Sequence, residues 1–521
     1  MIGYAVYLSL AFTHYGYFTI QYDIRISLHK DQEIINNFIL ILECLGCVLG
    51  SLLDSLIVRY GKRYRFIIGN TIIFLFSFPL YLSDPHVVIL FCGLMYGIGV
   101  GLVTSIAPFY MKEVIPASIL PLTLVSLQFF LIFGDEIAFL LSYIMSEYDG
   151  THGKLLNLIV FLIPVIIAGM QIILGFTVFK RDTPLRLLED MLEDECLMEL
   201  QKLYPDNLTR MAEYDKIRDN LFRIKWQYPS FKELFSERHI KSTIKGFILV
   251  GLQNCVGVFI FLVFTLSVFR DVHSFKQKNL ILTGIKFMST FFLFAIIHPK
   301  GMKLLLLIGC IGVAITNYGN LILRLIYNDV KDPDFHIIAL LNMGTGYAFD
   351  GISTCILPIV YACQIMSERG FALSMFLYWF TNGAIMISFF YLIKHFNESD
   401  YEIYMYYLAF FCLSATVLAG YVFDGISTCI LPLVYACQIM SERGFALAMF
   451  LYWFTNGAIM ISFFYLIECF DEFDYDIYMC YLAFFCLSAT VLAGYVIIKV
   501  PVKEEKSPGN KDTNEDSILS N

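Results

Sequence analysis

Amide and aromatic side chains recur inside long apolar stretches of this sequence. They fall in three short runs: Gln128 in "LQFFLIFG", Gln253 and Asn254 in "LQNCVGV", and Trp379 and Asn382 in "YWFTN". An amide donates and accepts hydrogen bonds at once, as a pair of neighbouring hydroxyl groups does, and an aromatic ring can cover an apolar C–H face. These side chains are candidates for contacts with a ligand, although a single amide can also serve only to bond a neighbouring helix.

The composition says what kind of protein holds these side chains. The chain has 521 residues, of which 58% are hydrophobic and 16% are charged, and its mean hydropathy is +0.69. A soluble protein would carry about a quarter charged residues. Apolar runs of about 20 residues, long enough to cross a bilayer as helices, recur along the whole chain. We therefore expect an all-α polytopic membrane protein, with the lipid bilayer as one of its partners.

The apolar runs predict helices in two groups of six. The first group covers roughly 1–22, 34–58, 66–83, 87–111, 117–145 and 154–179, and the second 245–269, 280–297, 304–327, 337–364, 371–393 and 403–422. A polar insert between them shows helical patterning in "LRLLEDMLEDECLMELQKLY". The expected parts are a first half at 1–179, the insert at 180–244, a second half at 245–422, a duplicated copy at 423–497 and a polar tail at 498–521. Two such halves suggest a substrate site between them.

Basic residues set the expected orientation. They cluster after the second span, in "RYGKRYR", and in the insert, whereas "SEYDGTHG" and "NDVKDPDFH" on the opposite side are poor in them. The positive-inside rule therefore places the insert and both ends of the twelve-span body in the cytoplasm. The first residues have no basic region or cleavage site, so we expect a first span and not a removable signal.

Charged side chains also fall within the expected spans, among them Asp135, Glu136, Lys286 and Asp350. Charges inside a membrane are costly and by default indicate function, so these are candidates for coupling transport to a proton. Two other interpretations stay open. Asp350 can pair with Lys286 for structure alone, and Asp135 and Glu136 can lie in water near the outer mouth.

A segment near the C-terminus occurs twice in succession. Gly346–Ala419 and Gly420–Ala493 match almost letter for letter, with differences such as Lys394/Glu468 and Tyr406/Cys480. Each copy encodes three spans, and an odd number of crossings would insert the second copy upside down, against the charge rule. We therefore expect a recent tandem duplication or an assembly error, with the first copy docked in the bundle and three further helices at its periphery.

The sequence supports neither a metal site nor another cofactor. The 14 cysteines lie mostly inside apolar runs and show no metal-ligand spacing. No enzymatic chemistry and no nucleic-acid partner is expected. The oligomeric state cannot be read from the sequence.

Loop motifs resemble the sugar porter branch of the major facilitator superfamily. "PFYMKEVIP" matches P-x-Y-x-x-E-x-x-P and includes Glu113, "VRYGKR" resembles D-R-x-G-R-R, and "RDTPLRLL" resembles P-E-S-P-R-x-L-L. The resemblance implies a major facilitator fold and a cytoplasmic network that joins the halves and breaks when the inner gate opens. The residues it points to are Arg59, Lys62, Arg63, Glu113, Asp182 and Arg369. Val58 and Leu94 stand where the family has charged residues.

The same resemblance assigns the amides and rings to sugar binding. Gln128, Gln253, Trp379 and Asn382 match family positions, while Asn254 replaces a Gln. "PIVYACQ" resembles P-W-x-Y-x-x-E, and it keeps Tyr361 but has Gln364 in place of Glu and Ile359 in place of Trp. Phe259 and Tyr378 replace family Asn residues. The implied site makes fewer hydrogen bonds than that of a typical hexose carrier.

The resulting prediction is a transporter that moves a hexose such as glucose by alternating access. Proton-coupled relatives carry an Asp in span one where this chain has Phe18, which favours facilitative uniport. Proton-coupled symport is the alternative within transport, and a non-transporting nutrient receptor on the same fold is the alternative from another class. The plasma membrane is the expected location.

Overall fold

Helices account for the regular structure in the described part of the chain. The computed structural model describes residues 2–28, 33–82, 86–116, 119–147, 151–204, 206–223, 230–236, 239–256, 272–297, 302–326 and 333–395, with no strand among them. Contacts divide the chain into two compact units, Met1–Phe423 and Asp424–Asn521. The second copy of the repeat, the tail and the expected span at 403–422 lie outside the described residues.

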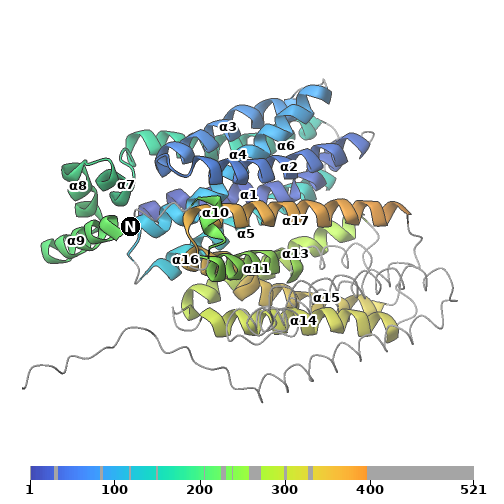
Figure 1. The fold of residues 1–521 in the computed structure, drawn as a ribbon. Helices are drawn as coiled ribbons and strands as arrows, with labels where there is room; N and C mark the ends of the chain where they lie inside the picture. The colour runs from blue at the N-terminus through green and yellow to red at the C-terminus, as the bar shows by residue number, and fades with distance from the viewer. Residues whose placement is uncertain are drawn as a thin grey trace, which may run out of the picture. The chain divides into compact units, whose positions relative to one another are not determined.

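The first half consists of long helices that lie side by side (Figure 1). They are α1 (Ile2–Leu28), α2 (Glu33–Ile57), α3 (Lys62–Leu82), α4 (His86–Val114), α5 (Leu120–Glu147) and α6 (Thr151–Thr177). Each corresponds to an expected span, with ends that differ by a few residues. The sequence therefore locates these helices well.

Glycines let the helix pairs of the first half approach closely. In α2 and α4, a Cβ on Gly46 would overlap the Leu94 carbonyl, and one on Gly97 would overlap the Glu43 carbonyl. In α1 and α5, a Cβ on Gly16 would overlap the Leu131 carbonyl. Small residues at such contacts are typical of helices that pack inside a bilayer. They hold α1, α2, α4 and α5 in fixed register around the centre of the molecule.

The second half contains α11 (Ile240–Val256), α13 (Val272–Ile296), α14 (Met302–Ile326), α15 (Pro333–Phe349), α16 (Leu357–Ile365) and α17 (Glu368–His395). The expected single span at 337–364 is divided here. A π-helical turn, η2 (Asp350–Thr354), joins α15 to α16. Pro358 has no N–H to donate to the carbonyl four residues earlier, which explains why regular α-helix cannot run through this point.

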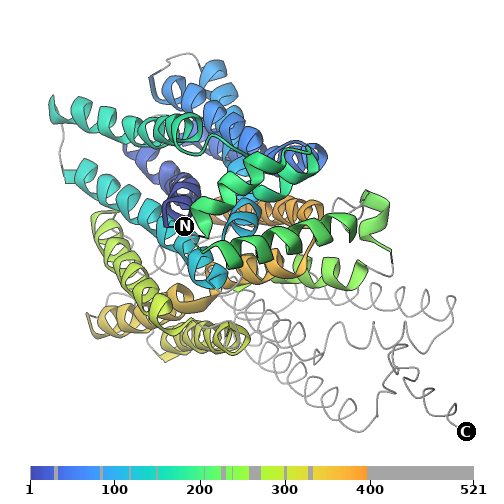
Figure 2. The same cartoon turned by 90° about the vertical axis from the view of Figure 1, so that its left-hand side faces the viewer.

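The insert forms four short helices among the described residues: α7 (Pro184–Glu189), α8 (Glu193–Leu203), α9 (Asn207–Arg223) and α10 (Phe231–Leu234). The first three lie beyond one end of the bundle, near the N-terminus (Figures 1 and 2), whereas α10 lies beside α17. The helical pattern that the sequence shows is interrupted at Met191, whose φ is 60°. Glu199 of α8 is fully buried and accepts a hydrogen bond from the Tyr4 hydroxyl of α1. Its Oε2 forms an ion pair with Lys202 Nζ at 2.6 Å. The insert is thereby fastened to the first half.

Four helical stretches in the described residues are long and apolar enough to cross a membrane. They are Val87–Val114, Leu120–Ile144, Gln277–Ile296 and Phe335–Ile365. The last of these runs through η2 and α16.

The two halves meet along several helix pairs. α17 packs against α2 and α4, α5 against α13, and α16 against α4 and α5. In Figure 1, α17 runs between α1, α2, α3, α4 and α6 on one side and α11, α13, α14 and α15 on the other. Side chains at the ends and at the middle of these pairs therefore decide how the halves are joined.

Candidate functional site

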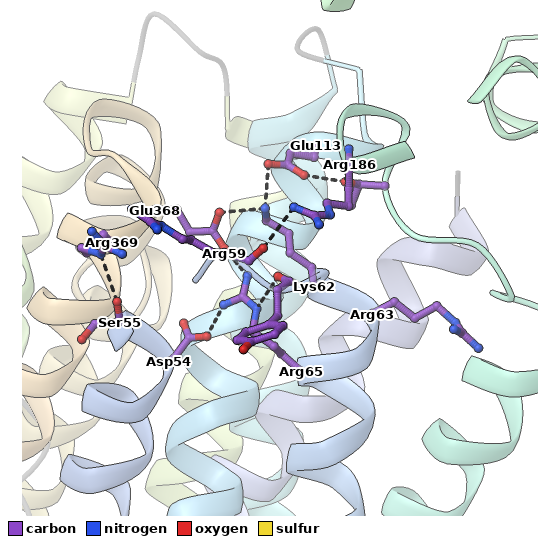
Figure 3. Close-up of polar contacts among 12 residues, drawn as sticks. Asp54, Ser55, Arg59, Lys62, Arg63, Arg65, Glu113, Arg186, Glu368 and Arg369 are labelled. Carbon is purple, nitrogen blue, oxygen red and sulfur yellow. Dashed lines mark hydrogen bonds and ion pairs between the residues drawn. The ribbon is translucent and has the colours of Figure 1, made fainter. Parts of the chain in front are cut away.

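Charged side chains from four helix ends form a buried cluster between the halves (Figure 3). We call it the end network; it consists of Asp54 of α2, Lys62 and Arg65 of α3, Glu113 of α4 and Glu368 of α17. Lys62 Nζ lies 2.8 Å from Glu113 Oε1 and 2.7 Å from Glu368 Oε2. Arg65 pairs with both Asp54 and Glu368. Glu368 thus ties the second half to two cations of the first.

The turn between α2 and α3 is held by the chain that enters the insert. Gly61 lies against the Asp182 carboxylate, which a Cβ at residue 61 would overlap. Asp182 accepts from the backbone N–H of Arg63 at 3.3 Å and of Thr183 at 2.9 Å. Thr183 caps α7 and donates its hydroxyl to Glu113 at 2.7 Å. These contacts orient Lys62 and Glu113 toward each other.

Two further contacts cross between the halves near the end network, and each caps a helix C-terminus. Lys112 of α4 donates to the carbonyl of Cys363, in the last turn of α16, at 2.7 Å. Arg369 of α17 donates to the carbonyl of Ser55, in the last turn of α2, at 3.1 Å. Cations at helix C-termini are favourable because they meet unpaired carbonyls and the negative end of the helix dipole. Each half therefore supplies one cap to the other.

An arginine of the insert lies at the edge of this region. Arg186 of α7 donates to the carbonyl of Arg59 at 3.0 Å and to Glu189 at 3.1 Å. Burial raises the pKa of Glu189, and the nearby Arg186 guanidinium opposes that rise. The Arg59 side chain itself is exposed.

At the middle of the bundle, Gln128 of α5 reaches across to the second half. Its side chain is fully buried, and Nε2 donates to Thr290 Oγ1 of α13 at 3.3 Å and to the Gly351 carbonyl in η2. Its Oε1 has no hydrogen-bond partner among the described residues. A buried acceptor without a partner is costly, so it marks a place where a ligand hydroxyl can bind.

An ion pair lies directly beside Gln128. Lys286 Nζ of α13 is 2.8 Å from Asp350 Oδ2 of η2, and both side chains are buried. Thr354 also donates to Asp350. The pairing that the sequence left open as a structural alternative is therefore present.

Two acidic side chains of α5 face the same helix. Asp135 is buried and contributes to the electrostatic environment of Lys286. Glu136 is partly buried, and its Oε1 lies 3.6 Å from the position that a Cβ on Gly284 of α13 would take. Charged groups from both halves are thus gathered around one contact between α5 and α13.

Aromatic side chains from both halves meet close to this point. The Tyr15 hydroxyl of α1 hydrogen-bonds with the Tyr378 hydroxyl of α17. The Tyr15 ring meets the Trp379 ring edge-on at a centroid distance of 4.8 Å. Asn382 is buried one turn further along α17, and Tyr361 is partly buried in α16. Gln253 and Asn254 lie in α11, but their side chains are outside the described residues.

Comparison with known proteins identifies the family. The profile of the family described as "Sugar (and other) transporter" matches residues 1–433. The chain belongs to this sugar transporter family. It is accordingly an integral multi-pass membrane protein, and its family is one of transporters and not of enzymes.

Individual relatives share part of the chain. "Hexose transporter 1" of Plasmodium yoelii yoelii is 28% identical over 322 residues, 58% of this chain and 63% of the relative. The protein of the same name from Plasmodium falciparum (isolate 3D7) is 28% identical over 302 residues, 55% of this chain and 60% of the relative. "Sugar transport protein MST8" of Oryza sativa subsp. japonica is 24% identical over 318 residues, 58% of each chain. The match thus spans less than two thirds of the length of these relatives.

Solved structures show the fold. The proton:xylose symporter XylE bound to 6-bromo-6-deoxy-D-glucose superposes with a TM-score of 0.68 at 19% identity, covering 80% of this chain and 94% of XylE. A partially occluded inward-open form of XylE from E. coli gives 0.63 at 17% identity, covering 84% and 99%. The major facilitator fold expected from the loop motifs is confirmed.

Four of the six residues that the sugar transporter motifs point to lie in or beside the end network. Lys62 and Glu113 are members, while Asp182 and Arg369 flank it. Arg63 points away toward α6 (Figure 3), where it donates to the carbonyls of Gly175 at 3.1 Å and Phe179 at 2.9 Å.

Sequence reasoning missed Asp54, Arg65, Lys112 and Glu368. One signal was available for Glu368: Gln364 stands where the family has Glu, and Glu368 follows four residues later, at the start of α17. It supplies a carboxylate near the position from which one is missing.

The described residues hold no cluster of His, Cys, Asp or Glu suited to a metal ion. Their seven free cysteines are all buried, and they behave as small apolar side chains.

Proposed function

We propose that this protein carries a neutral hexose such as glucose across the membrane by alternating access. The observation that carries the proposal is Gln128, a fully buried amide that joins the halves and leaves its acceptor oxygen open to a hydroxyl group. Relatives named hexose transporters support the same substrate class. The sugar would replace part of the contact between Gln128 and the second half, so binding and the movement of the halves are linked.

The proposed binding set extends from Gln128 to the aromatic side chains. Trp379 would cover an apolar C–H face of the sugar, and Asn382 and Tyr361 would bond its hydroxyl groups. Gln253 and Asn254 of α11 are proposed as further amide ligands. Tyr378, which replaces a family Asn, contacts Tyr15 and thereby helps to close the space between the halves.

We place the protein in the plasma membrane as part of this proposal. The end network is proposed as its cytoplasmic gate. Its ion pairs join the halves in the present conformation, which supports a gate that is closed at that end. Opening it would separate Glu368 from Lys62 and Arg65, and would remove both cross-half helix caps. Asp182 and Arg369 would act by orienting the groups that separate.

The test is uptake of radiolabelled glucose in cells that lack their own hexose carriers. The full chain would be compared with Gln128→Leu and with a chain lacking residues 420–493, each normalised to its surface abundance. We expect uptake by the wild type or the shortened chain, and loss of at least about 10-fold in Gln128→Leu. Wild-type and shortened chains that both reach the surface without moving any hexose would contradict the proposal and favour a receptor.

Proton-coupled symport is a second candidate that one observation favours. Lys286, Asp350 and Asp135 lie together between the halves, where a change of ion-pair partner could take up or release a proton. A symporter would accumulate sugar against its gradient and lose that accumulation when a protonophore is added. A uniporter, which the loss of the span-one Asp at Phe18 favours, would only equilibrate the sugar.

A further inference from the structure

The contact between α5 and α13 has two unlike sides. On one side, Phe129 of α5 packs against Phe287 and Phe291 of α13 with centroid distances of 5.2 and 5.4 Å. Phe133 extends this aromatic wall, and both Phe133 and Phe291 are exposed on the outside of the protein. Such a wall separates what lies behind it from lipid.

Behind the wall, α13 presents a row of polar side chains to the interior. Asn279, Thr283, Lys286 and Thr290 recur at intervals of four, three and four residues, which places them on one helix face. All four are buried, and the row covers about 16 Å of helix. Its Thr290 end touches Gln128, so the row begins at the proposed sugar site and leads away from the end network.

The far end of this row contains a polar group that the protein leaves open. Asn279 is fully buried, yet neither its Oδ1 nor its Nδ2 has a hydrogen-bond partner among the described residues. Glu136 on the facing helix hydrogen-bonds with Thr283, and its Oε2 is buried without a hydrogen-bond partner among the described residues. An amide with both atoms open can receive a hydroxyl group as donor and acceptor at once. Packing alone would not need it, because a buried polar group without partners lowers stability.

The charges along the row disfavour an anionic ligand. The Lys286 ammonium is neutralised by Asp350 at 2.8 Å. Glu136 and Asp135 face the row from α5, and both would repel an anion such as a sugar phosphate or a uronate if ionised. The row therefore offers hydroxyl-binding groups without an attraction for an anionic substrate.

We propose that Asn279 and Thr283, together with Glu136, form a second sugar subsite on the α5–α13 contact. The inference rests on the proposed function, because it takes the substrate to be a neutral sugar. A sugar arriving from the face away from the end network meets this subsite before it reaches Gln128. A sugar arriving through the end network meets Gln128 first.

The test measures binding from each face separately. Phenyl β-D-glucoside, chosen as a probe too bulky to be carried, is added to one face of right-side-out or inside-out vesicles, and its inhibition constant against glucose flux is determined. Asn279→Leu should raise this constant about 2- to 10-fold at the face away from the end network and less than about 2-fold at the other. Thr283→Val, which keeps the side-chain shape, should raise it in the same direction by a smaller factor. Gln128→Leu should raise it at both faces.

Two matched variants separate binding from structure. Asn342 also carries an amide in a helix of the second half, but its Nδ2 donates to the Thr316 carbonyl at 2.7 Å and to Asn320 Oδ1 at 2.6 Å. Thr316, like Thr283, is buried and bonded to the carbonyl four residues earlier. Asn342→Leu and Thr316→Val should leave both inhibition constants unchanged. Equal shifts at both faces, or none, in variants that carry glucose would overturn the subsite, whereas a wild-type chain without hexose flux would overturn the proposed function itself.

Discussion

The end network and the α5–α13 contact both join the two halves, but they do so with different chemistry. In the end network, carboxylates and cations from opposite halves pair directly, as Glu368 does with Lys62 and Arg65. At the α5–α13 contact the Lys286–Asp350 ion pair stays within one half, and Gln128 makes hydrogen bonds across to the other half. The first region satisfies its charges and holds the halves together. The second leaves buried polar atoms open, as a binding site must.

The largest effect is expected from removing the carboxylate that bridges the halves. Glu368→Ala leaves Lys62 and Arg65 each without one partner, which should destabilise the closed conformation by about 3–5 kcal/mol. The buried thiol of Cys363, beneath the network, should then react about 100-fold faster or more with a maleimide. The measurement uses a chain carrying Cys437→Ser, because the repeat copies this cysteine. Glu213→Ala removes an exposed ion pair of the insert and serves as the control; an unchanged rate in Glu368→Ala would show that the end network does not hold the halves closed.

The Lys286–Asp350 ion pair should affect the stability of the fold but not the closure of the end network. Lys286→Met leaves Asp350 buried without its cation, and should lower the free energy of unfolding by about 3 kcal/mol. Adding Asp350→Asn should restore most of that loss, since both charges are then gone. The thermal midpoint of the purified protein reports this, with Lys216→Met in an exposed pair as a control. Faster labelling of Cys363 in Lys286→Met would contradict the distinction between the two regions.

The helix cap from Lys112 should contribute less than the ion pairs. Lys112→Met removes one charged hydrogen bond to the end of α16, worth about 1–2 kcal/mol. The labelling rate of Cys363 should rise about 10-fold, and Lys112→Arg should retain most of the protection. A rise as large as that of Glu368→Ala would make the caps, and not the ion pairs, the main contacts of the gate.

The smallest effect is expected at the turn that orients the network. In Gly61→Ala the new methyl group meets the end of the Asp182 side chain, which can rotate away. The cost should be at most about 1 kcal/mol, because the two hydrogen bonds that Asp182 accepts are lost but no charge is left buried. Labelling of Cys363 should change less than in Lys112→Met. A larger change would mean that the Asp182 contacts are part of the closure itself.

Local sequence patterns were sufficient to find the helices and the central amide. Apolar runs mark α1 to α6 within a few residues, and Gln128 is recognisable because an amide in such a run must find a partner. Lys286 and Asp350 were also recognisable as costly charges. These features depend on residues close in sequence or on the free-energy cost of burying a polar or charged group in lipid.

The end network could not be derived in this way. Arg65 and Glu368 are far apart in the chain, and they meet only because the ends of α3 and α17 converge in the folded bundle. Lys112 bonds backbone carbonyls, which every residue carries, so no residue type signals its partner. The π-helical turn inside the expected span at 337–364 was missed as well, although Pro358 was present to suggest an irregularity. The expected placement of the two copies of the repeat stays a prediction beyond residue 395.

The π-helical turn at Asp350–Thr354 has a consequence for the direction in which side chains between α15 and α16 face. The Cys355 N–H bonds the Asp350 carbonyl at 3.2 Å, so this turn holds one residue more than an α-helical turn. One residue corresponds to about 100° of helical phase. Because the extra residue is accommodated within this one turn, deleting it would leave an α-helical turn and keep the side chains of α16, including Tyr361, facing as they do now. Sliding the turn by one position would instead rotate a single residue by this angle, at the exchange of a single hydrogen bond.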